Sequence, residues 1–163
     1  MKPSFKKIKI LALDFDGTLT DGFVYVDQKG NEMVRCSRRD SLGTNMLQKR
    51  GIFVVIISKE KNPVVKLSAK KMGVDCFSGV ATGDDKLSML SAYAAKKKVL
   101  LSHVAYVGDD VNDLAVLKRV GFPMSVANAD PSVKKVSLFI SSRDGGNHAV
   151  REICDNILKA RGY

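Results

Sequence analysis

Apolar and polar residues follow one another in blocks that predict strands alternating with helices. Three runs are almost wholly apolar, as in strands buried on both faces of a parallel sheet: residues 8–14 (IKILALD), 52–58 (IFVVIIS) and 103–110 (HVAYVGDD). Apolar residues at helical spacing, several times followed by glycine, predict helices at 40–50, 62–73, 85–97, 111–121 and 148–160. Shorter elements are expected at 74–79, 122–129, 131–136 (a brief helix) and 138–140. This alternation predicts an α/β fold, with one parallel sheet covered by helices on both faces.

One segment breaks the alternation early in the chain. Two β-rich runs, 23–26 and 32–36, flank the turn signal DQKGN, so a small β-hairpin is expected as an insertion after the first strand. No linker, internal repeat or low-complexity segment divides the sequence. We therefore expect a single domain over residues 1–163.

The composition is that of an ordinary globular protein, with 45% hydrophobic and 27% charged residues. No apolar stretch approaches the roughly 20 residues needed to span a bilayer. The apolar segment after the basic N-terminus ends at Leu13, which is too short for a signal peptide. The three cysteines form no CxxC pair and leave an odd count, which fits a reducing compartment. We expect a cytoplasmic protein without a membrane partner.

The formal net charge of +10 has three possible explanations. These are solvated helix faces, attraction of an anionic small substrate, and nucleic-acid binding. The lysine clusters at 6–7, 70–71, 96–98 and 134–135 are scattered, and several fall where helices are expected to end, a position that favours cations. No aromatic residues lie between them, so nucleic acid is not an expected partner.

Polar side chains gather where the predicted strands end. Asp14 and Asp16 follow the first strand, Ser58 the second, and Asp109 and Asp110 a later one. Ligands of open parallel sheets bind outside the carboxyl ends of the strands, so these groups are expected to share one crevice. Four carboxylates in one crevice repel one another unless a cation is present, and hard oxygen ligands select Mg²⁺.

The stretch LALDFDGTLTDG (residues 11–22) has other interpretations when it is read alone. It could form a solvated turn, a calcium loop or a nucleotide-sugar site. An EF-hand is excluded because the later ligand positions and the closing glutamate are missing. Lys86, at a predicted helix start, would add a fixed positive charge near the carboxylates. This combination of groups favours a magnesium site.

Four motifs carry a resemblance to a known superfamily. DFDGT at 14–18, Ser58, Lys86 and GDDVND at 108–113 resemble the motifs of haloacid dehalogenase (HAD) phosphatases in order and separation. The intervals between them leave room for the hairpin but not for a cap domain, so a capless HAD-like (Rossmann-type) form is implied. Over almost its whole length the chain looks like the phosphatases of 3-deoxy-octulosonate 8-phosphate and of nine-carbon 2-keto sugar acid 9-phosphates. The matching landmarks are DGFVYVDQKGNE, RRDSLG, VGDDVNDLAVLKRVG and GGNHAVREICD.

The resemblance implies a Mg²⁺-dependent hydrolase that removes the terminal phosphate of a 2-keto-3-deoxy sugar acid phosphate. Asp14 would attack phosphorus and form an aspartyl phosphate, while Asp16 would act as general acid and base. Ser58 and Lys86 would hold the phosphoryl oxygens. The metal would be bound by the carboxylates of Asp14 and Asp109 and by the main-chain carbonyl of Asp16.

Several residues are expected to support these groups. Asp113 would anchor Lys86 or a metal-bound water, Asp110 would lie just outside the metal, and Thr18 would brace the catalytic turn with its hydroxyl. Asp21, at the start of the hairpin, would be a structural or substrate-side residue.

The residues expected to bind the sugar each have a structural alternative. Arg39 and Asp40 match the stretch that contacts the sugar acid in the family, but Asp40 would also suit a helix N-cap. The octulosonate enzymes have Thr-Gly-Arg where this chain has Ser58, Lys59 and Glu60, a pattern similar to the nine-carbon enzymes. Glu60 would read a sugar hydroxyl or N-acyl group, or would simply face solvent. His148 replaces a glycine of the family pattern and would contact substrate or only begin a helix.

The resemblance also implies a homotetramer in which the hairpin contributes to assembly and a neighbouring subunit helps to close each site. The alternative is a catalytically weak HAD module that oligomerises in association with a CMP-sugar-acid synthetase. Degenerate modules of that kind lose a motif carboxylate. This chain keeps Asp14, Asp16, Lys86 and Asp109, which favours the enzyme.

Overall fold

The structure, a computed structural model, describes residues 4–163. Within this part of the chain a six-stranded sheet has the order β5-β4-β1-β6-β7-β8, and every neighbouring pair is parallel. Its strands are β1 (Ile10–Leu13), β4 (Phe53–Ile57), β5 (Asp75–Phe77), β6 (Val104–Gly108), β7 (Phe122–Ser125) and β8 (Phe139–Ile140). All residues of β1 and β6 are buried, which confirms the prediction of central strands covered on both faces.

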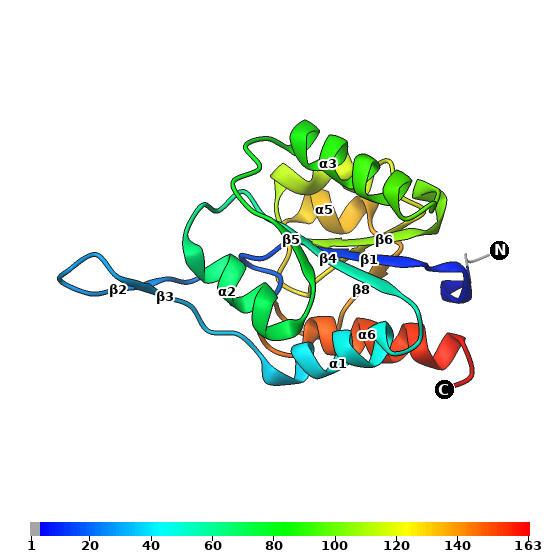
Figure 1. The fold of residues 1–163 in the computed structure, drawn as a ribbon, viewed down its shortest axis with the longest axis horizontal. Helices are drawn as coiled ribbons and strands as arrows, with labels where there is room; N and C mark the ends of the chain where they lie inside the picture. The colour runs from blue at the N-terminus through cyan, green and yellow to red at the C-terminus, as the bar shows by residue number, and fades with distance from the viewer. Residues whose placement is uncertain (1–3) are drawn as a thin grey trace.

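Helices cover both faces of the sheet, as predicted. α1 (Arg38–Gln48) and α6 (Ala149–Ala160) pack together on one face, whereas α3 (Gly83–Lys96), α4 (Leu114–Leu117) and α5 (Pro131–Val136) lie on the other (Figure 1). α2 (Pro63–Met72) packs beside β5 and α1. Short 3₁₀ helices span Phe5–Lys7, Leu101–His103 and Val111–Asp113. No helix of residues 4–163 is both long enough and apolar enough to cross a membrane.

The expected hairpin is present and projects away from the sheet (Figure 1). β2 (Tyr25–Val26) pairs with β3 (Glu32–Met33) in antiparallel orientation, and the Asp27 side chain accepts hydrogen bonds from two backbone N–H groups of the turn. Between β1 and β4 the chain contains only this hairpin and α1, and between β4 and α3 only α2 and β5. The described residues therefore contain no cap domain, in agreement with the prediction.

Two details of the predicted helices were wrong. The helix expected at 111–121 is a 3₁₀ turn at Val111–Asp113 followed by the four-residue α4, and within this turn the Asp113 side chain accepts the backbone N–H of Asp109 (3.1 Å). Asp40 was expected as a possible helix N-cap, but α1 begins earlier and Ser37 is its cap. The Ser37 hydroxyl oxygen accepts the N–H groups of Arg39 and Asp40.

Asp40 instead joins α1 to α6. Its Oδ1 accepts the backbone N–H of Arg151 (2.8 Å), while Oδ2 is buried without a hydrogen-bond partner. Only 1% of Asp40 is exposed. Burial raises the pKa of Asp40 to about 6, against the opposing effects of the Arg151 N–H and guanidinium. The joint between these two helices thus contains a carboxyl that is costly to ionise.

This pKa predicts a pH-dependent stability. The ordinary pKa of aspartate is about 3.9, so from about pH 4 to 6 the folded state binds the Asp40 proton more tightly than the unfolded state. The contribution of Asp40 to the free energy of unfolding therefore falls as pH rises through this window, by an amount on the order of 2 kcal/mol. Asp40→Asn keeps an acceptor for Arg151 but cannot ionise. We expect its melting temperature, relative to wild type, to be higher at about pH 7 than at about pH 4.

Asp40→Ala is the matched control, because it removes both the charge and the acceptor. It should be less stable than Asp40→Asn at both pH values. Parallel plots of melting temperature against pH for wild type and Asp40→Asn would contradict this account.

Candidate active site

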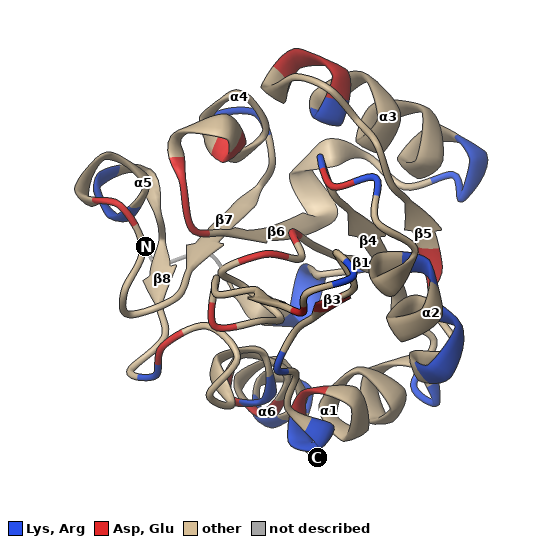
Figure 2. Ribbon diagram, turned by 90° about the vertical axis from the view of Figure 1, so that its left-hand side faces the viewer, with Lys and Arg blue, Asp and Glu red and all other residues tan. Residues whose placement is uncertain are grey.

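The sheet register brings the predicted catalytic residues to one edge. Leu13 of β1 is aligned with Ile56 of β4 and with Val107 of β6, so the residues that follow these strands emerge side by side. A cavity of about 570 Å³ opens there. Its lining contains Asp14, Asp16, Gly17, Gly22, Ser58, Lys59, Glu60, Lys61, Asp109, Asp110 and Asn112. Figure 2 looks onto this end of the molecule and shows acidic segments close to the ends of β1 and β6.

Lys86 lies beneath this cavity and is 1% exposed. Its Nζ donates to Oδ1 of Asp14 and to Oδ1 of Asp113, both at 2.8 Å. Thr82 and Asp85 form a reciprocal capping box at the start of α3, which fixes the helical turn that carries Lys86. Burial acts to lower the pKa of Lys86, but the two carboxylates outweigh it and raise the pKa, so the amine is held in its charged form.

Asp113 is the centre of a hydrogen-bond network. Its carboxylate is fully buried and accepts three hydrogen bonds, from Lys86 Nζ, from the Tyr106 hydroxyl (2.6 Å) and from the backbone N–H of Asp109 (3.1 Å). Burial, followed by the Asp113 charge, raises the pKa of Tyr106 well above its usual range, so the phenol stays a donor. Asp113 thus contacts Lys86 as expected. The contribution of Tyr106 was missed, although a hydroxyl in a wholly buried strand requires a partner.

Two motif glycines make room for these carboxylates. A Cβ added to Gly17, whose φ is +77°, would lie 2.0 Å from Oδ2 of Asp109. A Cβ on Gly108 would lie 2.4 Å from Oδ2 of Asp113. Both positions therefore require a residue without a side chain, because a carboxylate occupies the space.

Carboxylate oxygens of Asp14, Asp109 and Asp113 can lie within 4.8 Å of one another. Lys86 alone does not balance these charges. Burial, followed by the Asp113 charge, raises the pKa of Asp14 well above its usual range and raises that of Asp109 to about 7. A divalent cation among these hard oxygens would offset the repulsion, so the donor set fits Mg²⁺. Because Asp113 already accepts three hydrogen bonds, Asp14 and Asp109 are the carboxylates available to such an ion.

Asp16 lies at the mouth of the same cavity and is half-buried. Burial is the largest cause that raises the pKa of Asp16, and the neighbouring charges of Glu60 and Glu32 raise it further. A carboxyl whose proton is retained more firmly than usual suits the donation of a proton to a leaving group.

Ser58, Lys59 and Glu60 also line the cavity. The Ser58 hydroxyl oxygen accepts the N–H of Glu60 (3.0 Å). The Glu60 carboxylate accepts the N–H groups of Lys61 (2.6 Å) and Asn62 (2.8 Å), just before α2. Glu60 therefore faces the cavity and also stabilises the turn that leads into this helix.

The turn that follows β1 and carries Asp14 and Asp16 (residues 14–22, the catalytic turn) is braced by Thr20 and not, as expected, by Thr18. Thr18 Oγ1 is buried and has no hydrogen-bond partner among the described residues. The hydroxyl oxygen of Thr20 instead accepts the N–H groups of Gly17 and Gly22, both at 3.1 Å. The next residue, Asp21, forms an ion pair with Arg35 (3.1 Å) at the root of the hairpin.

Sequence comparison identifies the family of this chain. Residues 58–152 match the haloacid dehalogenase-like hydrolase family. The 3-deoxy-D-manno-octulosonate 8-phosphate phosphatase KdsC of Salmonella typhi is 34% identical over 158 residues, which cover 96% of this chain and 82% of the relative. The chain belongs to the haloacid dehalogenase-like hydrolases.

Solved structures agree with this membership of the HAD family. The 3-deoxy-D-manno-octulosonate 8-phosphate phosphatase of Moraxella catarrhalis, in complex with magnesium ion, phosphate ion and KDO, is 38% identical with a TM-score of 0.92, covering 98% of this chain and 90% of that one. The cobalt-bound deoxy-D-mannose-octulosonate 8-phosphate phosphatase of Haemophilus influenzae is 31% identical with a TM-score of 0.91, covering 98% and 92%. The predicted HAD-like fold is confirmed.

Three residues that the HAD resemblance assigned to substrate lie outside the catalytic cavity. Arg39 and His148 line a second cavity beside α6, and Asp40 is buried between α1 and α6. Asp110 does reach the catalytic cavity, and its Oδ1 accepts the N–H of Val111 (2.7 Å). Of the residues expected to bind the sugar, therefore, Lys59 and Glu60 line the catalytic cavity of the same chain.

Proposed function

We propose that this HAD hydrolase is a Mg²⁺-dependent phosphatase of a 2-keto-3-deoxy sugar acid phosphate. The observation that carries this proposal is the meeting of Asp14, Asp16, Ser58, Lys86 and Asp109 at the ends of three adjacent parallel strands. The sugar-acid substrate is inferred from relatives that are octulosonate 8-phosphate phosphatases. The alternative of a catalytically weak oligomerisation module is disfavoured because Asp14, Asp16 and Asp109 are all present and all line the cavity.

The proposed reaction has two steps. The Asp14 carboxylate attacks phosphorus, the P–O bond to the sugar breaks, and Asp16 protonates the leaving alkoxide. Asp16 then takes a proton from water, whose oxygen attacks the aspartyl phosphate and releases phosphate and the free Asp14 carboxylate. Ser58 and Lys86 hold phosphoryl oxygens as negative charge moves through them. Asp14, Asp109 and the main-chain carbonyl of Asp16 would hold Mg²⁺, which would supply further positive charge to the phosphate oxygens.

Two observations support different lengths for the carbon chain of the sugar acid substrate. The similar relatives are octulosonate 8-phosphate phosphatases, which supports an eight-carbon substrate. Glu60 departs from the pattern of that group and lines the cavity, which supports a nine-carbon nonulosonate 9-phosphate such as N-acylneuraminate 9-phosphate. The hydrogen bonds from Lys61 and Asn62 give Glu60 a structural purpose in either case.

Parallel assays on the two sugar acid phosphates test this function. The purified protein should release phosphate from at least one of them with Mg²⁺ and lose that activity with EDTA, because the carboxylate cluster lacks sufficient positive charge without the ion. Asp14→Asn should remain folded and inactive. A preference for the nine-carbon compound that Glu60→Gln abolishes would assign Glu60 to the substrate. Hydrolysis of neither compound, or turnover that persists in EDTA, would contradict the proposal.

We also propose that the chain assembles into a homotetramer through its hairpin. Phe23, Tyr25, Val26 and Met33 are 73, 60, 64 and 67% exposed, an unusual amount of apolar surface for so short a segment. Burying this surface against other copies would also bring a second chain close to each open catalytic cavity.

Sedimentation equilibrium tests this assembly. We expect about four times the chain mass of 17.8 kDa. Tyr25→Lys combined with Met33→Lys should shift the protein toward the monomer, because charges would replace two apolar contacts. Substitution of the exposed Leu100, which lies away from the hairpin, is the matched control. A monomeric wild-type protein would contradict the proposal.

A further inference from the structure

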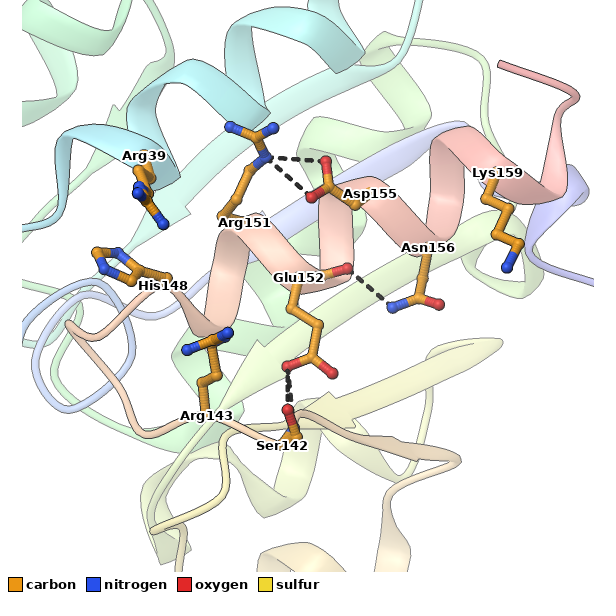
Figure 3. Close-up of a pocket in the computed structure, with 9 residues that line it drawn as sticks. All are labelled: Arg39, Ser142, Arg143, His148, Arg151, Glu152, Asp155, Asn156 and Lys159. Carbon is orange, nitrogen blue, oxygen red and sulfur yellow. Dashed lines mark hydrogen bonds and ion pairs between the residues drawn. The ribbon is translucent and has the colours of Figure 1, made fainter.

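A second cavity, separate from the catalytic one, lies along α6 and has a volume of about 530 Å³ (Figure 3). The two cavities share no lining residue. At one end of the second cavity three nitrogen-bearing side chains come from three different segments. They are Arg39 from the first turn of α1, Arg143 from the loop before α6, and His148 at the start of α6.

The two carboxylates of this cavity, Asp155 and Glu152, form hydrogen bonds with residues other than Arg39 and Arg143. Asp155 accepts two hydrogen bonds from Nε of Arg151, at 2.8 and 3.0 Å. Oε2 of Glu152 accepts from Ser141 (2.6 Å) and from Ser142 (2.9 Å to its N–H). Within residues 4–163, Arg39 and Arg143 have no carboxylate within ion-pair distance. The two guanidinium groups at this end of the cavity therefore form no ion pair.

The hydrogen bonding of Ser37 favours the neutral form of His148. The Ser37 oxygen already accepts two backbone N–H groups, so its own hydrogen is free to be donated to Nδ1 of His148, 2.7 Å away. His148 is then neutral, with its proton on Nε2 and no partner for that N–H among the described residues. Burial, followed by the charges of Arg39, Arg143 and Arg35, lowers the pKa of His148 and favours the same state.

These side chains offer hydrogen-bond donors and positive charge, and no acceptor. In the view of Figure 3, Arg39 lies above His148 and Arg143 lies below it, both at the same end of the cavity. We propose that Arg39, Arg143 and His148 form a binding site for a small oxyanion, a phosphate or carboxylate group, separate from the catalytic cavity. Guanidinium groups suit such ligands because two of their N–H bonds match two oxygens of one anion.

The chain between Arg143 and His148 connects this site to the catalytic turn. The Gly146 N–H donates to the carbonyl oxygen of Thr18 (3.1 Å), and a Cβ on Gly145 would lie 1.8 Å from the carbonyl oxygen of Gly17. An anion bound by Arg143 and His148 would hold both ends of a segment that packs directly on the catalytic turn.

Imidazole NMR can test the site, because His103 and His148 are the two histidines of the chain. Metal-free protein in EDTA is titrated with inorganic phosphate and, separately, with pyruvate, at constant pH and ionic strength. We expect a saturable shift of the His148 nitrogen signals while those of His103 stay unchanged. Saturation by phosphate points to a free-phosphate ligand, and saturation by pyruvate to a carboxylate of a 2-keto acid; either result supports the oxyanion site.

Two charge-removing variants make the test specific. Arg143→Gln should raise the apparent Kd by about tenfold or more, because a charge-assisted contact is lost. Lys159→Gln removes a charge from the other end of the same cavity and should change the Kd by less than about twofold. Absence of a saturable shift with either probe, or equal effects of both variants, would overturn the proposal. Because no metal and no turnover are involved, the result does not depend on the proposed function.

Discussion

The ion pairs of Lys86 with Asp14 and Asp113 are the constraint on which this site depends. An ammonium group that is 1% exposed is tolerable only between carboxylates, and breaking such a buried pair costs about 3–5 kcal/mol. Asp113 also accepts hydrogen bonds from Tyr106 and from the backbone of Asp109. The Asp113 side chain therefore fixes Lys86 of α3 and the loop after β6. Through Lys86 it also holds Asp14, which follows β1.

The surrounding fold is arranged to admit this network. Gly17 and Gly108 provide the space that the Asp109 and Asp113 carboxylates occupy, and Gly145 lies against the carbonyl oxygen of Gly17 from the other side. The order β4-β1-β6 places the three strand ends next to one another. Close backbone packing around the acids leaves little freedom for them to move apart, although their charges repel. The strain is electrostatic, and a bound cation would relieve it.

Periodicity was sufficient to predict a parallel sheet, its covering helices and the hairpin. The cluster of acids followed from the rule that ligands of parallel sheets bind at the carboxyl ends of the strands, on the assumption that the strands concerned are neighbours. The sequence could not reveal contacts between distant side chains. Nothing near Asp40 in the sequence indicates its bond to Arg151, and nothing near Thr20 shows that it, and not Thr18, caps the turn. The second cavity was likewise beyond prediction, since α1, the loop at Arg143 and α6 meet only in the folded chain.

The most direct test of this account is the turnover of Asp113→Asn beside that of Asp110→Asn. Both variants remove one carboxylate from the same motif, but only Asp113 contacts Lys86. With folding verified by circular dichroism, we expect Asp113→Asn to lower kcat by roughly a hundredfold or more, because Lys86 and Asp109 lose their anchor. Asp110→Asn should keep kcat within about tenfold of wild type. Equal kcat values for the two folded variants would contradict the central position of Asp113.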